Sequence, residues 1–129
     1  MPMTRIDTGE GWIGDRHQAV IEAVQSALAA ALKLPAWDRD IVLTEHPSRA
    51  RIVPPGRSAK YTRVEIALFA GRSSAAKRRL YAVICDNLEA LGVPRQEIKI
   101  ALIEVPRENW GVRGGQSAAD IDLGFEVEV

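Results

Sequence analysis

The sequence has no second cysteine, no net charge and no long apolar run. Because Cys85 is the only cysteine, no internal disulfide can form, which fits a reducing compartment. Lys+Arg and Asp+Glu both total 17, so the basic surface of a nucleic-acid or membrane-surface protein is missing. No apolar stretch reaches the ~18 residues of a membrane helix, and no secretion signal is visible. We therefore expect a cytoplasmic protein that binds neither nucleic acid nor membrane.

What the sequence does have is an ordinary globular composition. Apolar residues make up 47% and charged residues 26% of 129 residues. A chain of this length can bury a single hydrophobic core. We expect one domain over residues 1–129.

An internal repeat organises this chain. ALKLPAWDRDIVLTEHP (31–47) matches ALGVPRQEIKIALIEVP (90–106) at seven positions without a gap. Unrelated segments of this length share about one identity, so the repeat constrains the whole architecture. We divide the chain into halves 2–47 and 61–106, a Pro/Gly/Arg-rich loop 48–60 and a C-terminal tail 107–129.

Each half has the pattern of a β-α-β unit. In the first half, we expect a strand in PMTRIDT and a helix over residues 15–33, with Asp15 as its N-cap. The segment DRDIVLTEH alternates as a second strand. In the second half, we expect a strand in YTRVEIALFAG and a fourth strand in EIKIALIEV. Between them we expect a helix that is capped by Ser73 or Ser74 and ends at Gly92 and Pro94.

These elements predict an α+β fold in which two tandem β-α-β units form a four-stranded sheet. The strands of each unit are parallel across a helical crossover. The helices cover one face of the sheet, so the other face needs burial, most simply by self-association. The end of the tail, GFEVEV, suits an edge strand added to a neighbouring subunit.

The stretch GEGWIG (9–14) satisfies the glycine pattern of a dinucleotide-binding turn. The preceding PMTRIDT is too polar for a buried parallel strand, and the chain is too short for the six-stranded fold. We interpret the stretch as a flexible loop and expect no cofactor and no metal.

Four segments together resemble one family. They are Pro2 in the first strand, DRDIVLTEHP (38–47), AGRSSAAKRRLY (70–81) and VPRENWGVRGG (105–115). With the two β-α-β halves, they resemble the tautomerase superfamily, closest to the branch with malonate semialdehyde decarboxylase. The resemblance implies a cofactor-independent homotrimer with an N-terminal proline at the floor of an apolar pocket near a subunit boundary.

The chemistry of a proline amine agrees with that resemblance. An initiator methionine is usually removed before proline, which leaves Pro2 as a secondary amine. Burial and nearby cations depress an amine pKa towards the working pH, where a base moves protons best. We expect Pro2 to transfer the proton of a small keto or enol carboxylate.

The resemblance also implies partners for Pro2. Arg72 matches the arginine of the family's turn and would grip a carboxylate. Asp38 matches the acid that orients water in the decarboxylase branch, while His46 and Trp110 match family positions near the pocket. That branch has a second arginine where this chain has Ala70. We therefore expect a loop arginine to substitute, in the first place Arg113 and otherwise Arg51 or Arg57.

Two other functions stay open at this point. One is a decarboxylase or hydratase of a small 3-oxo or unsaturated acid that uses Pro2 and Asp38. The other is a non-catalytic ligand-binding module, because two β-α-β halves also suit a ferredoxin-like domain.

Overall fold

The computed structural model describes all 129 residues. Its four long strands are β1 (Met3–Gly9), β2 (Ile41–His46), β3 (Thr62–Phe69) and β4 (Ile98–Val105), and its two helices are α1 (His17–Leu32) and α2 (Ser74–Glu89). Short 3-10 turns η1 (Ser48–Ala50), η2 (Arg95–Glu97), η3 (Arg107–Asn109) and η4 (Ala118–Asp120) join them, and β5 (Gly111–Val112) pairs with β6 (Gln116–Ser117) in the tail. The predicted β-α-β repeat is confirmed.

The strands form one sheet in the order β2-β1-β3-β4. β1 runs parallel to β2 and β3 parallel to β4, while β1 and β3 are antiparallel at the centre. The parallel strands of each half are direct neighbours. This adjacency excludes the split β-α-β arrangement of a ferredoxin-like domain.

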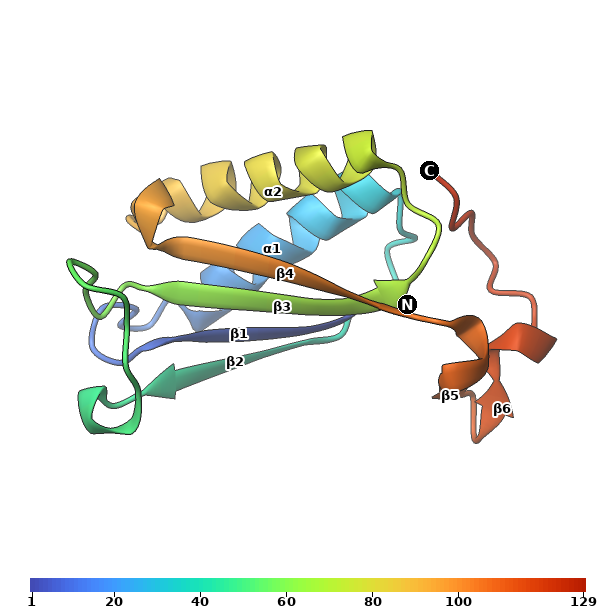
Figure 1. Cartoon of the computed structure of the whole chain (residues 1–129), viewed down its shortest axis with the longest axis horizontal. Helices are drawn as coiled ribbons and strands as arrows, with labels where there is room; N and C mark the ends of the chain where they lie inside the picture. Colours follow the sequence, from blue (N-terminus) through green and yellow to red (C-terminus); the bar gives the residue numbers. More distant parts are fainter.

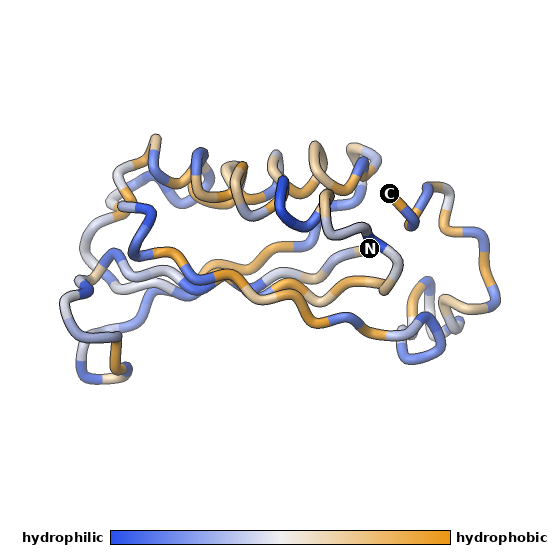
Figure 2. Tube along the Cα trace, turned by 45° about the horizontal axis from the view of Figure 1, so that its top comes forward, coloured by the Kyte–Doolittle hydropathy of each residue, from blue (hydrophilic) through white to orange (hydrophobic).

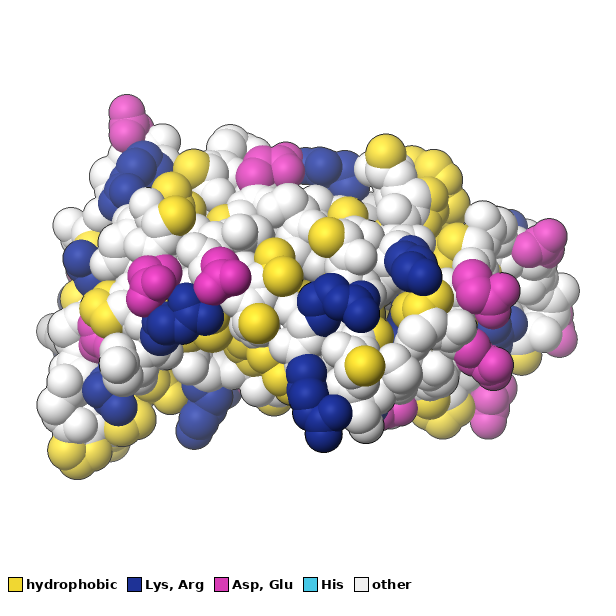
Figure 3. Space-filling model, turned by 90° about the horizontal axis from the view of Figure 1, so that it is seen from above, with side chains coloured by type: hydrophobic (Ala, Val, Ile, Leu, Met, Phe, Trp, Pro, Cys, Tyr) yellow, Lys and Arg dark blue, Asp and Glu magenta, His cyan; other side chains and the backbone are white.

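Both helices lie on the same face of the sheet (Figure 1). Each helix packs one apolar stripe against the sheet. Figure 2 shows apolar positions recurring along the helices and along the strands beneath them. The core between them contains Ile6, Val24, Leu28, Val64, Ile66, Leu80, Ile84 and Leu88. The outer side of the helices is covered by charges of both signs (Figure 3).

The two helix starts differ. Ser73 caps α2 as predicted, because its side-chain oxygen accepts a hydrogen bond from the Ala76 amide at 3.1 Å. The prediction that Asp15 caps α1 is wrong. The helix begins at His17 and Arg16 takes the N-cap position without a side-chain cap. Its guanidinium instead donates to the carbonyls of Ile13, Trp12 and Leu91, which ties the helix start to the end of the second helix.

The loop after β1 is anchored rather than free. Ile13 is buried in the core, and the Trp12 indole donates to the Thr8 hydroxyl at 3.0 Å. The tail also departs from the expectation of an edge strand. Residues 124–129 form no strand and fold back on their own chain, where Val127 is buried and the Ser73 amide donates to the Val129 carbonyl oxygen at 2.8 Å.

The face of the sheet away from the helices, which we call the open face, is uncovered in the chain. It presents Met3, Arg5, Asp7, Val42, Glu65, Ala67 and Ile103. Neither helix is long and apolar enough to cross a membrane.

Candidate active site

The start of the chain lies at the same end of the sheet as the C-terminal tail (Figure 1). Pro2 is buried directly before β1. Met3 pairs with Ala67 near the end of β3, and Thr4 pairs with Ile41 at the beginning of β2. The antiparallel pairing of β1 and β3 therefore places the end of β3 beside the N-terminus.

Asp38 reaches this end from the turn before β2. Its carboxylate oxygen Oδ2 lies 3.5 Å from the α-amine of Met1 and makes no hydrogen bond. The backbone on either side is fixed, since Gln25 donates to the Asp38 carbonyl at 3.0 Å and the Thr4 amide donates to the Asp40 carbonyl at 3.0 Å. The aspartate is held in place by its main chain while its carboxylate remains available.

Arg72 follows the sharp turn that ends β3. Gly71 has φ of 125°, a conformation that favours glycine, and the next side chain folds inward. Arg72 is only 6% exposed. Its Nη1 donates to the Phe69 carbonyl at 3.1 Å, but Nε and Nη2 have no partner. Buried guanidinium donors without an acceptor are costly, so the geometry is that of a site prepared for an anion.

Burial dominates the electrostatics of the three groups. It lowers the pKa of the Met1 α-amine; Asp38 opposes this shift, whereas Arg72 and then Arg107 favour it. Burial raises the pKa of the Asp38 carboxyl, against the attraction of the amine and Arg72. It also lowers the pKa of the Arg72 guanidinium, which Asp38 partly restores. An amine in this position is neutral at a lower pH than an ordinary α-amine.

Apolar side chains enclose this end of the molecule. Phe69, Ala118, Leu123 and Val127 form a small cluster with Met1, Trp110 and Phe125 at its edge. Trp110 lies edge-on to Phe69 with ring centroids 5.2 Å apart, and its indole donates to the Val105 carbonyl at 3.1 Å. Trp110 therefore forms part of the wall beside the N-terminus.

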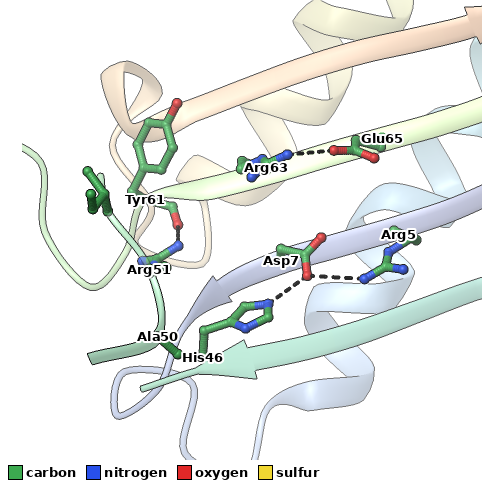
Figure 4. Close-up of a pocket in the computed structure, with 9 residues that line it drawn as sticks. Arg5, Asp7, His46, Ala50, Arg51, Tyr61, Arg63 and Glu65 are labelled. Carbon is green, nitrogen blue, oxygen red and sulfur yellow. Dashed lines mark hydrogen bonds and ion pairs between the residues drawn. The ribbon is translucent and has the colours of Figure 1, made fainter. Parts of the chain in front are cut away.

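His46 lies elsewhere in the chain. It ends β2, opposite Gly9 at the far end of β1, and its Nε2 is 2.7 Å from Asp7 Oδ1. It lines a hollow of about 310 Å³ together with Arg5, Arg51, Tyr61 and Arg63, whose side chains are drawn in Figure 4. The polar groups there already satisfy one another, since Arg63 pairs with Glu65 and Arg51 donates to the Tyr61 carbonyl. The structure does not bring His46 to Pro2 within one chain.

The expected loop arginines are also engaged away from the amine. Arg51 lies in the hollow with His46, and Arg57 lines the adjoining depression in the same loop. Arg113 sits in the turn between β5 and β6 and donates to the Asp122 carbonyl at 3.1 Å. Two residues near the amine were missed in the sequence, Phe69 and Arg107. Arg107 stands within the VPRENWG segment, but nothing in its spacing indicated which way it faces.

Residues 38–113 match the family described as "Tautomerase enzyme". The chain belongs to the tautomerase family and is an enzyme of that family. The 2-hydroxymuconate tautomerase of Pseudomonas putida is 35% identical over 51 residues, which are 39% of this chain and 81% of the relative. The corresponding enzyme of Comamonas testosteroni is 33% identical over 51 residues, with the same coverage of both proteins. Since 51 residues are 81% of such a relative, it has about half the length of this 129-residue chain, which agrees with the internal repeat.

Solved structures of this superfamily superpose over nearly the whole chain. FG41 malonate semialdehyde decarboxylase inhibited by 3-bromopropiolate has a TM-score of 0.80 and 30% identity, over 91% of this chain and 92% of that one. Native fused 4-OT has a TM-score of 0.81 and 25% identity, and the match covers 95% of this chain and 99% of that one. A fused 4-OT described as a symmetric trimer has a TM-score of 0.81 at 22% identity, over 91% and 96%, and supports the fold.

Proposed function

We propose that this enzyme is a homotrimer that uses the secondary amine of Pro2, freed by removal of Met1, for keto–enol proton transfer on a small α-keto or enol carboxylate. While Met1 is attached, the Pro2 nitrogen is an amide and cannot act as a base. The observation that carries the proposal is that the Met1 α-amine, buried Asp38 and an Arg72 whose Nε and Nη2 lack partners meet at the end of the sheet where Pro2 is buried. The curated relatives named 2-hydroxymuconate tautomerase support the reaction class.

The proposed reaction needs one base and one anion site. Neutral Pro2 nitrogen takes the proton of the enol hydroxyl, and the resulting ammonium returns it to the neighbouring carbon, which regenerates the amine. Arg72 binds the substrate carboxylate and stabilises negative charge that develops on the adjacent oxygen. The Asp38 carboxylate lies 3.5 Å from the Met1 α-amine, beside Pro2, and its negative charge would favour the ammonium that forms on Pro2 between the two steps. No further group is required for this proton balance.

The trimer is supported by the open face and by the neighbours. Met3, Val42 and Ile103 are about half exposed there, at 52%, 53% and 49%. With Ala67 they border a hollow of about 420 Å³ on the open face. Exposed apolar surface of this kind marks an association site. Several neighbours of this fold are trimers.

A decarboxylase or hydratase is the second candidate. It is favoured by the likeness to FG41 malonate semialdehyde decarboxylase and by Asp38, a raised-pKa carboxyl beside the amine that is suited to orient water. In that reaction, Pro2 would stay protonated and act as an acid. Turnover of malonate semialdehyde against 2-hydroxymuconate distinguishes the two candidates.

The test of the proposed function is the intact mass of the protein before and after brief exposure to 3-bromopropiolate. We expect a chain without Met1 that takes one label at Pro2. Pro2→Ala replaces the secondary amine held in the proline ring by a primary amine that is free to rotate. It should lower 2-hydroxymuconate turnover by about 100-fold, which is a typical contribution of a positioned base. Turnover that survives both Pro2→Ala and N-terminal acetylation would refute the proposal.

A further inference from the structure

Phe69 contacts two arginines, Arg72 through its carbonyl oxygen and Arg107 through its ring. It is the last residue of β3, is 1% exposed and accepts the Arg72 hydrogen bond on its carbonyl oxygen. The guanidinium carbon of Arg107 lies 5.8 Å from the centroid of its ring, within the range of a cation–π contact. Because Phe69 pairs with Val105 at the end of β4, the arginine that follows that strand comes beside the one that follows β3.

Among the charged groups that act on the N-terminal amine and on Arg72, the positive ones predominate. Arg72 and Arg107 both act on the N-terminal amine, and Asp38 is the one carboxylate that acts on both the amine and Arg72. Arg107 is exposed, and its guanidinium makes no hydrogen bond or ion pair, although its backbone carbonyl accepts from the Trp110 amide. Two guanidiniums and an amine act on one another and Asp38 is the carboxylate that opposes them, which favours the binding of a further negative charge. An anion is therefore the missing component.

Relying on the proposed function, we infer that Arg107 is a second anion-binding residue, which holds the substrate carboxylate together with Arg72 at the edge of Phe69. It takes the position for which the loop arginines were candidates. Arg51 and Arg113 are bonded to carbonyls elsewhere, and Arg57 lies with the loop at the far end of the sheet. The Arg107 guanidinium lies against the Phe69 ring, so part of its side-chain freedom is already lost before an anion binds.

Because Arg107 is exposed, we expect it to affect substrate binding rather than the maximal rate. A rim arginine contacts the carboxylate equally before and during the reaction, so its loss weakens binding and leaves the maximal rate almost unchanged. One charge-assisted contact is typically worth a 10- to 100-fold change in affinity. The contribution of an exposed charge also falls with ionic strength.

The experiment compares Arg107→Gln and Arg107→Lys with Arg79→Gln, an exposed arginine on α2 that undergoes the same loss of charge. Two readouts are used: the affinity for malonate, by calorimetry, and the saturation kinetics of Pro2 labelling by 3-bromopropiolate. In Arg107→Gln we expect malonate affinity to fall about 10-fold or more and half-saturation to rise equally, with an unchanged maximal labelling rate. The affinity of Arg107→Lys for malonate should lie between those of the wild type and Arg107→Gln, because lysine retains the charge without the planar guanidinium.

The two readouts separate this inference from the proposed function. If wild-type Pro2 reacts but Arg107→Gln behaves like Arg79→Gln, the inference is wrong and the enzyme proposal stands. If Pro2 is inert but malonate binding still depends on Arg107, the anion site stands and the proposed chemistry fails. A wild-type protein that does not bind malonate overturns the inference.

Discussion

At the scale of single residues, the site depends on a small set of charges removed from water. Asp38, Arg72 and Arg107 act on the Met1 α-amine, and burial is the largest influence on its pKa. Substitutions that change these neighbours should therefore shift the pH at which the amine becomes reactive, without any change in the fold.

Asp38→Asn should shift the reactivity of the N-terminal amine to lower pH. Asp38 raises the pKa of that amine through its negative charge, which the neutral Asn side chain lacks. The unprotonated amine then persists to lower pH. The measurement is the pH dependence of 3-bromopropiolate labelling of the N-terminal residue, whose midpoint is expected below that of the wild type.

Asp15→Asn is the matched control for that shift, because Asp15 is exposed and far from the amine. Its labelling midpoint should equal the wild-type value. A midpoint that moves upwards in Asp38→Asn, or moves equally in both variants, would show that Asp38 does not act on the amine.

At the scale of elements, the turn between β3 and α2 sets the position of the site. Gly71 makes the turn, Arg72 points inward and Ser73 caps the helix. The tail closes over the same turn, because the Val129 carbonyl accepts from the Ser73 amide. One short segment therefore fixes the anion-binding side chain, the helix start and the tail.

Ser73→Ala should destabilise the protein by about 1 kcal/mol, because the Ala76 amide loses its acceptor. The melting temperature should fall by about 2–5 °C at fixed protein concentration. Ser74→Ala removes the same hydroxyl one residue later, where no capping bond is made, and should have little effect. Equal melting temperatures for the two variants would contradict the cap.

Much of the element order is predictable from the sequence, and the exceptions have physical causes. The repeat and the alternating strands depend on local pattern, so all four strands and both helices were predicted. The Asp15 cap failed because Arg16 is held by the distant Leu91 carbonyl, a contact that local preference does not contain. The tail folds back through the burial of Val127 against Phe69, again a long-range contact.

In the candidate site, too, some residues could be predicted from the sequence and others depend on long-range contacts. Residues with a distinctive type and position, namely Pro2, Asp38 and Arg72, are brought together at one end of the sheet. His46 ends a strand parallel to β1 and so lies at the opposite end, which the topology alone could have indicated. Arg107 could not be singled out among many arginines, because its place follows from the pairing of Phe69 with Val105.

At the scale of the whole molecule, the two faces of the sheet have different surroundings. Helices cover one face and carry charges of both signs outward (Figure 3), whereas the open face leaves Met3, Val42 and Ile103 half exposed. Neutral net charge gives copies of this chain no overall repulsion. The open face is therefore the surface where the proposed trimer would form.

Ile103→Arg should dissociate that trimer. Closing the interface would bury the same unpaired guanidinium in every subunit, and each buried charge costs several kcal/mol. Light scattering should then report the 14.1 kDa chain instead of three times that mass, with an unchanged far-ultraviolet circular dichroism spectrum. Ala82→Arg makes the same addition on the exposed side of α2 and should leave the assembly intact. A trimer that persists in Ile103→Arg would place the interface elsewhere. Loss of Pro2 labelling in the dissociated variant alone would indicate that the reactive pocket needs the assembled trimer.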